Sequence, residues 1–454
     1  MFTSIILAAG MGTRMKSEKP KVIHKICGKE LCRWVAESSK KAGAETVVSV
    51  IGHKGELVRE ALGDMCEYAV QAEQKGTGHA LVQAIDYIKA AKENVVVLTG
   101  DAPLIKSETI ENAIKHHREN SNDITVITAI LTEPSGYGRI VRDENGNVLK
   151  IVEQKDATDA EKAICEVNSG MYVFNSTSLA DALGKLTPNN AQGEYYLTDT
   201  LEILLSEGKK AGAYTVSDND EIRGINDRIQ LSEAEKIMHN RIVRYHMLNG
   251  VTMHCPDSIY IEDGVEIGKD TEIDRNTEIL SGTKIGSNCY IGMGSRLEGA
   301  VIGDGVEVLS SYILESEIGN NTHVGPFAYV RPNCKVGENV KVGDFVEIKN
   351  SVIDDKTKIS HLTYIGDSDV GKNVNFGCGT VTCNYDGKKK FRSTIGDNSF
   401  VGCNTNLVSP VNVGARAYIA AGSTITEDIP DGSMSIARSR QTNKIGWADE
   451  KKKY

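Results

Sequence analysis

Bulky aliphatic residues recur at every sixth position from Ile261 to Leu297. A period of six fits neither the α-helix, with 3.6 residues per turn, nor the β-strand, whose side chains alternate with a period of two. A fixed short repeat is typical of a solenoid, and six residues is the step of a parallel β-helix. One step alone could not bury its aliphatic side chain, whereas stacked coils can. The sequence therefore predicts a β-helix that starts near Ile261.

The six-residue register continues beyond Leu297 as far as Ile425, with occasional five-residue steps and one interruption after Thr382. Glycine often follows the aliphatic residue, which suits a tight corner. If three steps close one coil, residues 261–427 form about nine coils, and stacking at about 4.8 Å gives a prism about 40 Å long.

Composition narrows the class of protein. The formal net charge of −10 implies no strongly basic face, which argues against a nucleic-acid partner. The 10 cysteines show no CxxC pair or Cys/His ligand spacing, so we expect neither a zinc site nor a disulfide framework. The chain begins on a strand-like run without signal-peptide features, and no 18-residue apolar stretch occurs. We therefore expect a cytoplasmic protein without an integral membrane segment.

Strand and helix signals alternate over residues 1–225. The β-branched runs that predict strands are Ile5–Ala8, Thr46–Ile51, Val95–Thr99 and Ile124–Ile130. The clearest helical patterns between them are Leu31–Gly43 and Gly78–Ala91. This alternation predicts a mostly parallel sheet with helices on both faces, and ligands gather at the carboxyl ends of the strands in such sheets.

A glycine-rich turn follows the first predicted strand. Gly10 and Gly12 would let backbone N–H groups approach an anion, and a helix start would add its dipole. The turn is not the dinucleotide fingerprint, because Met15 stands at the third glycine position, and no GK[ST] closes a Walker A loop. With Arg14 and Lys21 it suits a nucleoside triphosphate. A plain strand–helix turn is the alternative.

Asp101 stands at the carboxyl end of the predicted strand Val95–Thr99. A sheet of this class would hold a metal there, over its ligand pocket. Magnesium usually takes one or two protein ligands together with substrate phosphates and water, so one aspartate suffices. The alternative is a capping or solvated carboxylate before Pro103.

A single helix is predicted between the two halves, over residues 228–249. Its apolar residues follow three- and four-residue spacing, with charges on the opposite face. Ser232 with Glu235 three residues later is a helix-start pair, and Asn249-Gly250 is a helix stop.

Two features depart from the regular prism. Residues 382–392 leave the six-residue register and carry four basic side chains, which would attract an anion; a solvated bulge is the alternative. His361 stands beside a repeat position. Imidazole takes up a proton near neutral pH, so His361 is a candidate general base, although a hydrogen-bonded structural histidine is equally compatible with the local pattern.

Four motifs then carry a resemblance. They are LAAGxGTRM with a downstream Pro20-Lys21, QAEQxGTGHA from Gln71 to Ala80, GDxPLI from Gly100 to Ile105, and GYGRI from Gly136 to Ile140. They resemble the sugar-1-phosphate nucleotidyltransferases. With the hexapeptide solenoid behind them, residues 3 to about 447 resemble the bacterial bifunctional enzymes that join such a nucleotidyltransferase to a hexapeptide-repeat acyltransferase.

The resemblance implies an α/β fold in three parts. Residues 1–227 would form a Rossmann-like uridyltransferase domain, 228–249 a linker helix, and 250–454 a left-handed parallel β-helix acetyltransferase domain with a C-terminal arm. The prisms would associate as a homotrimer. Acetyl transfer from acetyl-CoA to glucosamine-1-phosphate would precede magnesium-dependent uridyl transfer from UTP, giving UDP-N-acetylglucosamine for cell-wall synthesis. Alternatives are a single nucleotidyltransferase with a structural or regulatory β-helix, and a nucleotide-sugar-sensing assembly protein.

The resemblance also implies residue roles in the first half. Arg14 and Lys21 would neutralise the triphosphate, and Asp101 and Asn226 would hold magnesium. The remaining contacts with the nucleotide sugar would come from Leu7, Ala8, Ala9, Gly10, Gln71, Gly76, Thr77, Gly138, Glu153 and Asn168.

In the second half His361 would be the base for the amine of glucosamine-1-phosphate. The resemblance places Arg331, Lys349, Tyr364 and Asn375 around that substrate, and Cys378, Asn384, Tyr385, Cys403, Ala421 and Arg438 around acetyl-CoA. Two positions depart from the family pattern, which leads us to expect alanine at Cys378 and serine at Cys403. If the serine hydroxyl matters, the geometry at Cys403 differs, and the thiol there would be a candidate reactive group.

Overall fold

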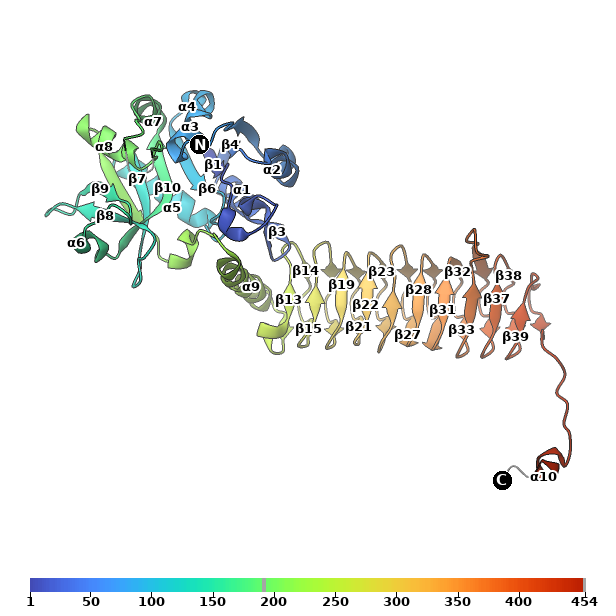
Figure 1. Ribbon diagram of the computed structural model, residues 1–454. Coiled ribbons are helices and arrows are strands. Elements are labelled where there is room, and N and C mark those ends of the chain that lie inside the picture. The colour runs from blue at the N-terminus through green and yellow to red at the C-terminus, as the bar shows by residue number, and fades with distance from the viewer. Residues whose placement is uncertain (190–192, 452–454) are drawn as a thin grey trace. The chain divides into compact units, whose positions relative to one another are not determined.

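The computed structural model describes residues 1–189 and 193–451. The chain divides into two compact units between Met238 and His239 (Figure 1). The first unit is an α/β domain and the second is a β prism, and each is described by itself.

A nine-stranded sheet forms the centre of the first unit, among the described residues. Its main strands, in spatial order, are β11 (Ala211–Thr215), β7 (Ile124–Ile130), β10 (Glu166–Asn175), β6 (Asn94–Thr99), β1 (Phe2–Ala8), β4 (Ala44–Ile51) and β5 (Glu67–Val70). All four strands predicted from the sequence are present. Strands β6, β1, β4 and β5 run parallel, as does β11 to β7.

Strand β10 is the antiparallel exception to the predicted parallel order. It also pairs with β8 (Gly138–Arg142), which forms a hairpin with β9 (Val148–Val152). The sheet is therefore mixed. This pairing sets Asn168 of β10 directly opposite Gly138 of β8.

Helices cover both faces of the sheet, as predicted. The two faces have separate apolar cores, one containing Val35 of α1 and Ile110 of α5, the other containing Leu81 of α3 and Leu201 of α8. The α-helices before residue 228 are α1 (Leu31–Lys41), α2 (Gly55–Leu62), α3 (Thr77–Val82), α4 (Ile85–Ala90), α5 (Ser107–Glu119), α6 (Asp159–Lys162), α7 (Ser176–Leu183) and α8 (Asp199–Ser206).

The single helix predicted over Gly78–Ala91 is wrong, because α3 and α4 are two short helices. The last turn of α3 tightens, with Gln83 N–H donating to Ala80 O at 3.2 Å and Ala84 N–H donating to Leu81 O at 2.9 Å. The Gln83 side-chain amide also donates to His79 O at 3.2 Å. These shorter-range hydrogen bonds satisfy the carbonyl groups at the end of α3, and the helix ends there.

The predicted connecting helix is present as α9 (Arg228–Leu248). Its start is not marked by Ser232, which lies inside the helix. Asp227 caps it instead, since Asp227 Oδ1 accepts from the backbone N–H groups of Ile229 and Gln230, both at 2.9 Å. An aspartate side chain satisfies orphan N–H groups at a helix start as well as serine does.

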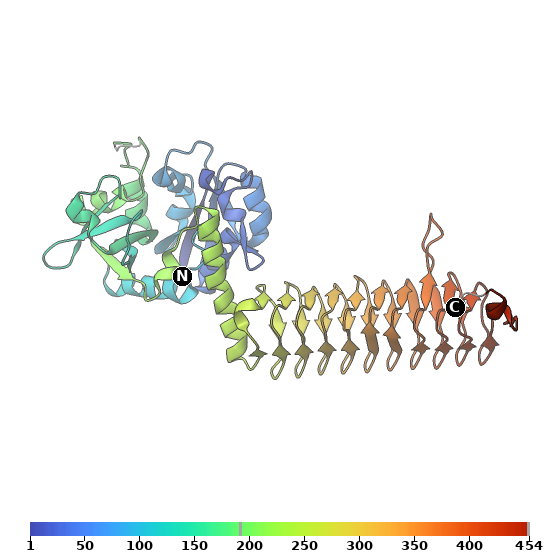
Figure 2. The same cartoon turned by 60° about the horizontal axis from the view of Figure 1, so that its bottom comes forward.

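Three parallel sheets form the second unit, which is a left-handed parallel β-helix (Figure 2). The first sheet contains β12 (Thr252–Met253), β15 (Glu272–Ile273), β18 (Tyr290–Ile291), β21 (Glu307–Val308), β24 (His323–Val324), β27 (Lys341–Asp344), β30 (Lys358–His361), β33 (Asn375–Phe376), β36 (Phe400–Val401), β39 (Tyr418–Ile419) and β41 (Met434–Ser435). The second contains β13 (Tyr260–Ile261), β16 (Glu278–Ile279), β19 (Arg296–Glu298), β22 (Tyr312–Leu314), β25 (Tyr329–Val330), β28 (Glu347–Lys349), β31 (Tyr364–Gly366), β34 (Val381–Cys383), β37 (Asn406–Val408) and β40 (Thr424–Ile425). The third contains β14 (Glu266–Ile267), β17 (Lys284–Ile285), β20 (Val301–Ile302), β23 (Glu317–Ile318), β26 (Lys335–Val336), β29 (Val352–Ile353), β32 (Ser368–Val370), β35 (Ser393–Ile395) and β38 (Asn412–Val413).

The register confirms three six-residue steps per coil. Ile261 pairs with Ile279, and Ile273 pairs with Ile291, each eighteen residues on. The inward aliphatic side chains stack into one continuous core along the prism. Asparagine occupies many corners in the left-handed region, for example Asn339 with φ +55°. Asparagine tolerates this conformation better than other residues with a side chain.

The interruption of the six-residue register after Thr382 corresponds to a loop between β34 and β35. Thr382 takes the inward position in its coil, where it is 1 % exposed, and its Oγ1 accepts from Gly366 N at 2.7 Å. The chain between β34 and β35 then leaves the prism as a projecting loop, visible in orange in Figure 2. Along the described residues, no helix has the length and apolar character needed to cross a membrane.

Candidate active sites

A pocket of about 410 Å³ opens at the carboxyl ends of β1 and β6. Its lining comes from four parts of the chain that are far apart in the sequence. The predicted residues along it are Leu7, Ala9, Gly10, Lys21, Gln71, Gly76, Thr77 and Asp101. Ala8 does not line the pocket, because its side chain is buried in the core beside them.

The glycine-rich turn exposes its backbone to the pocket. A Cβ added at Gly10 would meet no atom within 4 Å, so the backbone there is accessible. Gly12 adopts φ +64°, and a Cβ there would lie 2.5 Å from Lys21 Cβ. A short 3-10 turn, Thr13–Met15, follows the glycines in place of an α-helix. The turn therefore supplies backbone N–H groups without a helix dipole.

Lys21 lies between the two predicted magnesium ligands. Its ammonium contacts Asp101 Oδ2 and donates to Asn226 Oδ1 at 3.0 Å. Arg14 donates to the same Asn226 oxygen at 2.9 Å. One carboxylate and one amide oxygen thus converge around a cation, which is a donor set that magnesium accepts when substrate phosphates complete its shell. Within the described residues no cluster of three His, Cys, Asp or Glu side chains suits a metal.

Gln71 is the buried polar side chain of the pocket, at 4 % exposed. Its amide nitrogen donates to Gly76 O at 3.1 Å and lies 3.1 Å from His79 Nδ1. Gln74, which the sequence analysis missed, donates to Ala9 O at 2.8 Å and so ties the glycine-rich turn to this segment. Its nitrogen is engaged, and among the described residues its oxygen accepts no hydrogen bond, so that oxygen can accept one from a base.

Gly138, Glu153 and Asn168 come together on the β8–β9–β10 side of the domain, outside the lining of that pocket. A Cβ at Gly138 would lie 3.5 Å from Glu153 Oε1 and 3.6 Å from Asn168 Cβ. Asn168 Nδ2 donates to the Tyr172 hydroxyl at 2.9 Å. Burial raises the pKa of the Glu153 carboxyl, and the charges of Asp156 and Asp199 add to the effect. This group can offer hydrogen bonds to a neutral ligand such as a sugar.

His361 ends β30 in the prism and pairs in register with Asp344 at the end of β27. The imidazole Nδ1 lies 2.6 Å from Asp344 Oδ1. A carboxylate accepts only, so Nδ1 carries the proton and Nε2 remains an acceptor. The sequence analysis missed Asp344, although adding one coil, seventeen residues, to its position leads to His361.

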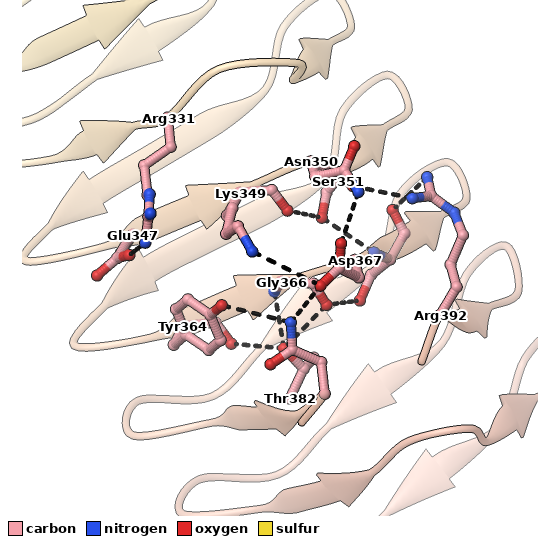
Figure 3. Close-up of polar contacts among 12 residues, drawn as sticks. Arg331, Glu347, Lys349, Asn350, Ser351, Tyr364, Gly366, Asp367, Thr382 and Arg392 are labelled. Carbon is pink, nitrogen blue, oxygen red and sulfur yellow. Dashed lines mark hydrogen bonds and ion pairs between the residues drawn. The ribbon is translucent and has the colours of Figure 1, made fainter. Parts of the chain in front are cut away.

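Arg331, Lys349 and Tyr364 form one polar group with residues that were not predicted (Figure 3). Arg331 pairs with Glu347 at 2.9 Å, and Lys349 lies 4.0 Å from Asp367 Oδ2. The pKa of the Lys349 ammonium is lowered, first by the neighbouring Lys390 ammonium of the projecting loop and then by burial. A site with several cations and too few carboxylates suits an anion.

Asn384 joins this group rather than standing apart, since its Nδ2 lies 3.4 Å from the Tyr364 hydroxyl and also donates to Asp367. Tyr385 is the exposed next residue, and its hydroxyl donates to Gly387 O at 2.7 Å. Asn375 lies on β33, in a different sheet from Tyr364.

The remaining predicted residues form a column at one corner of the prism. Asn404 N–H donates to Cys378 O, and Gly422 N–H donates to Cys403 O, both at 2.8 Å. Cys378, Cys403 and Ala421 therefore occupy equivalent positions on successive coils. The column ends beside Arg438, because a Cβ at Gly422 would lie 3.5 Å from Arg438 Cδ.

Two family profiles match the two units. The nucleotidyl transferase profile matches residues 3–229, and the profile for the bacterial transferase hexapeptide (six repeats) matches residues 264–299, 315–350 and 392–427. The bifunctional protein GlmU of Acetivibrio thermocellus is 60 % identical, over 99 % of this chain and 97 % of its own length. The chain belongs to the bifunctional GlmU family. GlmU proteins of Caldanaerobacter subterraneus subsp. tengcongensis and Clostridioides difficile are 54 % and 52 % identical, each over 99 % of this chain and 98 % of their own length.

Membership of the GlmU family confirms what the motifs and the hexapeptide repeat predicted. The chain is a bifunctional enzyme with uridyltransferase and acetyltransferase activity, and its two profiles fall in the two structural units. The alternative of a non-enzymatic sensing protein is thereby set aside.

Proposed function

We propose that this chain makes UDP-N-acetylglucosamine in two steps at two sites. Residues 250–454 transfer the acetyl group of acetyl-CoA to glucosamine-1-phosphate. Residues 1–227 then join the product to UTP and release pyrophosphate, and residues 228–249 connect the two catalytic domains. The observation that carries the proposal is that each unit has its own cation beside a carboxylate: Lys21 with Asp101 in the first, and Lys349 with Asp367 in the second. Lys349 ends β28, which pairs with β31, the strand that follows His361.

Uridyl transfer needs positioning and charge neutralisation, with no covalent intermediate. Gln71 presents its amide oxygen to the uracil, and Gly10 leaves the backbone open to the phosphates. A phosphate oxygen of the sugar phosphate attacks the α-phosphorus of UTP, and pyrophosphate leaves. Arg14 and Lys21 stabilise the charge that develops on the phosphoryl oxygens.

The oxygens of Asp101 and Asn226 would hold magnesium, which would supply further positive charge at the phosphates. Lys21 contacts both of these oxygens in the structure. The Lys21 ammonium, which lies beside these oxygens, would bind the triphosphate. The sugar and its N-acetyl group are held by Gly138, Glu153 and Asn168.

Acetyl transfer requires a neutral amine, and His361 removes its proton. Asp344 holds Nδ1–H, so Nε2 faces the substrate as the base. The amine nitrogen attacks the thioester carbonyl, the tetrahedral intermediate collapses, and the CoA thiolate leaves and takes up the proton from His361. Arg331 and Lys349 bind the sugar phosphate, Tyr364 and Asn375 hold the sugar, and Asn384 and Tyr385 orient the acetyl group. Cys378, Cys403, Ala421 and Arg438 contact the acetyl-CoA chain.

The β prism assembles as a homotrimer in this proposal. Phe327 and Phe345 stack at one corner with ring centroids 5.5 Å apart, and they are 59 % and 57 % exposed. Leu362 continues the column on the next coil at 57 % exposed. Exposed apolar side chains in contact mark an interaction surface. We place the enzyme in the cytoplasm, since the ten cysteines are free within residues 1–189 and 193–451.

The decisive assay supplies glucosamine-1-phosphate, acetyl-CoA, UTP and magnesium to the purified chain. We expect free CoA thiol, then pyrophosphate and UDP-N-acetylglucosamine. Omitting UTP should leave CoA release intact. Pyrophosphate from UTP and N-acetylglucosamine-1-phosphate without any CoA release would support the alternative of one activity with a structural β-helix.

A further inference from the structure

Asp367 is a buried carboxylate at the corner between β31 and β32. The residue is 6 % exposed, and its φ of +49° lies in the left-handed region. Its backbone N–H donates at 2.9 Å to the carbonyl of Lys349, one coil earlier. A buried carboxylate is costly unless it is hydrogen-bonded and paired, so its partners explain why the fold tolerates it.

Both carboxylate oxygens of Asp367 are used, as Figure 3 shows. Oδ1 accepts from Asn350 Nδ2 at 2.5 Å. Oδ2 accepts from Asn384 Nδ2 and lies 4.0 Å from Lys349 Nζ. The two amide donors are neutral, so the negative charge stays available to Lys349.

Asn384 is the first residue after β34 and so begins the projecting loop. It is 7 % exposed, and its amide is held between Asp367 and the Tyr364 hydroxyl. Gly366 makes this packing possible, because a Cβ there would lie 2.4 Å from the Tyr364 hydroxyl oxygen and 2.6 Å from Asn384 Nδ2. Asp367 therefore fixes where the loop leaves the prism and which way the Asn384 amide faces.

Lys349 is the second group that Asp367 holds. The Lys349 side chain is 17 % exposed and neighbours two other cations, Lys390 and Arg331. Arg331 has Glu347 as its own partner at 2.9 Å. The carboxylate of Asp367 lies behind Lys349 and counteracts the repulsion from Lys390, which would otherwise push the ammonium groups apart.

We propose that Asp367 is a positioning residue for acetyl transfer: without touching the substrate, it fixes the Asn384 amide and the Lys349 ammonium around the amino-sugar phosphate. The inference rests on the proposed acetyl transfer at this site. The proposed site therefore includes, besides the groups that contact the substrate, the buried carboxylate that fixes their positions.

Asp367→Asn keeps the size of the side chain and removes its charge. We expect kcat/KM for glucosamine-1-phosphate to fall at least about tenfold, through a higher KM for this substrate, because hydrogen bonds to charged groups contribute that much. KM for acetyl-CoA should change little, and uridyl transfer by the same preparation should be unchanged. Asp367→Glu, which restores the charge on a longer side chain, should recover part of the loss.

Asp369→Asn is the matched control. Asp369 lies two residues on and pairs with Arg392 at the other end of the same loop, with Arg392 Nε 2.6 Å from Asp369 Oδ2. Among the described residues its ion pair is with Arg392 and not with Lys349. Its loss should therefore leave KM for glucosamine-1-phosphate close to that of the unmodified enzyme. Equal defects in Asp369→Asn and Asp367→Asn would overturn the proposal, since any tether of the loop would then suffice.

The pH dependence of KM for glucosamine-1-phosphate distinguishes a positioning role of Asp367 from a general destabilisation of the prism. Asp367 raises the pKa of Lys349, while Lys390, Arg331 and burial lower it. Removing the carboxylate lowers that pKa further, so Lys349 loses its proton at a lower pH. KM for glucosamine-1-phosphate should therefore begin to rise at a lower pH in Asp367→Asn than in the unmodified enzyme. An unshifted profile would contradict the proposal.

The unmodified enzyme distinguishes the two possible failures. If it releases no CoA from acetyl-CoA and glucosamine-1-phosphate, the proposed function fails before any variant is compared. If it is active and Asp367→Asn has unchanged kcat/KM, only the role of Asp367 is refuted. If Asp367→Asn unfolds, Asp367→Glu decides: its KM for glucosamine-1-phosphate must exceed that of the unmodified enzyme, and an unchanged KM refutes the role.

Discussion

The imidazole Nδ1 of His361 lies 2.6 Å from Asp344 Oδ1, and the two residues are register partners on adjacent coils. The hydrogen bond from His361 is the main cause of the lowered pKa of the Asp344 carboxyl. The parallel pairing of the two strands thus holds a carboxylate against the ring nitrogen that is not used as the base. In many enzymes a loop has this role.

Replacing His361 should separate the two activities. In His361→Ala we expect acetyl transfer to fall by at least about a hundredfold, the contribution typical of a general base. Asp344→Asn should cause a smaller loss, because the ring can still take the proton but is no longer held in one tautomer. Uridyl transfer, measured by pyrophosphate release, should be unchanged in both variants. Loss of both activities in His361→Ala would count against separate sites.

Removal of magnesium should affect only the first unit. With EDTA in excess we expect pyrophosphate release to stop and CoA release to continue, because Asp101 and Asn226 belong to the α/β domain. Asp101→Asn should mimic EDTA at ordinary magnesium concentrations. Acetyl transfer that also requires the metal would contradict this division, as would full uridyl transfer in Asp101→Asn.

Cys403 offers a direct probe of the acetyl-CoA column. Its thiol is exposed, and Ala421 occupies the same position one coil further on. Acetyl-CoA should slow alkylation of Cys403 by N-ethylmaleimide, followed by mass spectrometry. Cys165, an exposed thiol in the other unit, is the internal control and should react at the same rate with and without acetyl-CoA. Equal rates for Cys403 under both conditions would remove this residue from the site.

The prism and the spacing of its corners could be predicted closely from the sequence, because one inward aliphatic side chain per six residues is compatible with few other folds. The glycine-rich turn and Asp101 were also predictable, since strand ends of an α/β sheet converge. The burial of Asp367 was not predictable, because nothing in the sequence distinguishes a buried aspartate from an exposed aspartate at a corner of the prism. The capping of α9 by Asp227 and the break between α3 and α4 depend on side-chain hydrogen bonds. Helix propensities do not predict such bonds.

The stability of the α/β domain should depend on His117. Burial lowers the pKa of His117 to about 4, and its Nδ1 lies 2.9 Å from Thr125 Oγ1. The unfolded chain takes up this proton near pH 6.5 but the folded domain does not, so stability is full above pH 6.5 and falls as the pH drops toward 4. The loss can reach about 3 kcal/mol.

Thermal unfolding followed from pH 7 to pH 4 tests this expectation. His117→Gln, which cannot titrate, should show a shallower fall in the melting temperature of the α/β domain over that range. His116→Gln, at the neighbouring half-buried position of α5, is the control and should follow the unmodified enzyme. Identical slopes for His117→Gln and the unmodified enzyme would refute the role of His117.

The most direct test of two independent sites mixes two single-site variants. His361→Ala and Asp101→Asn are each incubated with glucosamine-1-phosphate, acetyl-CoA, UTP and magnesium, alone and together, and UDP-N-acetylglucosamine is measured. We predict almost no product from either variant alone and restored synthesis from the mixture, because the acetylated intermediate made by one can be used by the other. Product from either variant alone at the normal rate, or none from the mixture, would contradict the account.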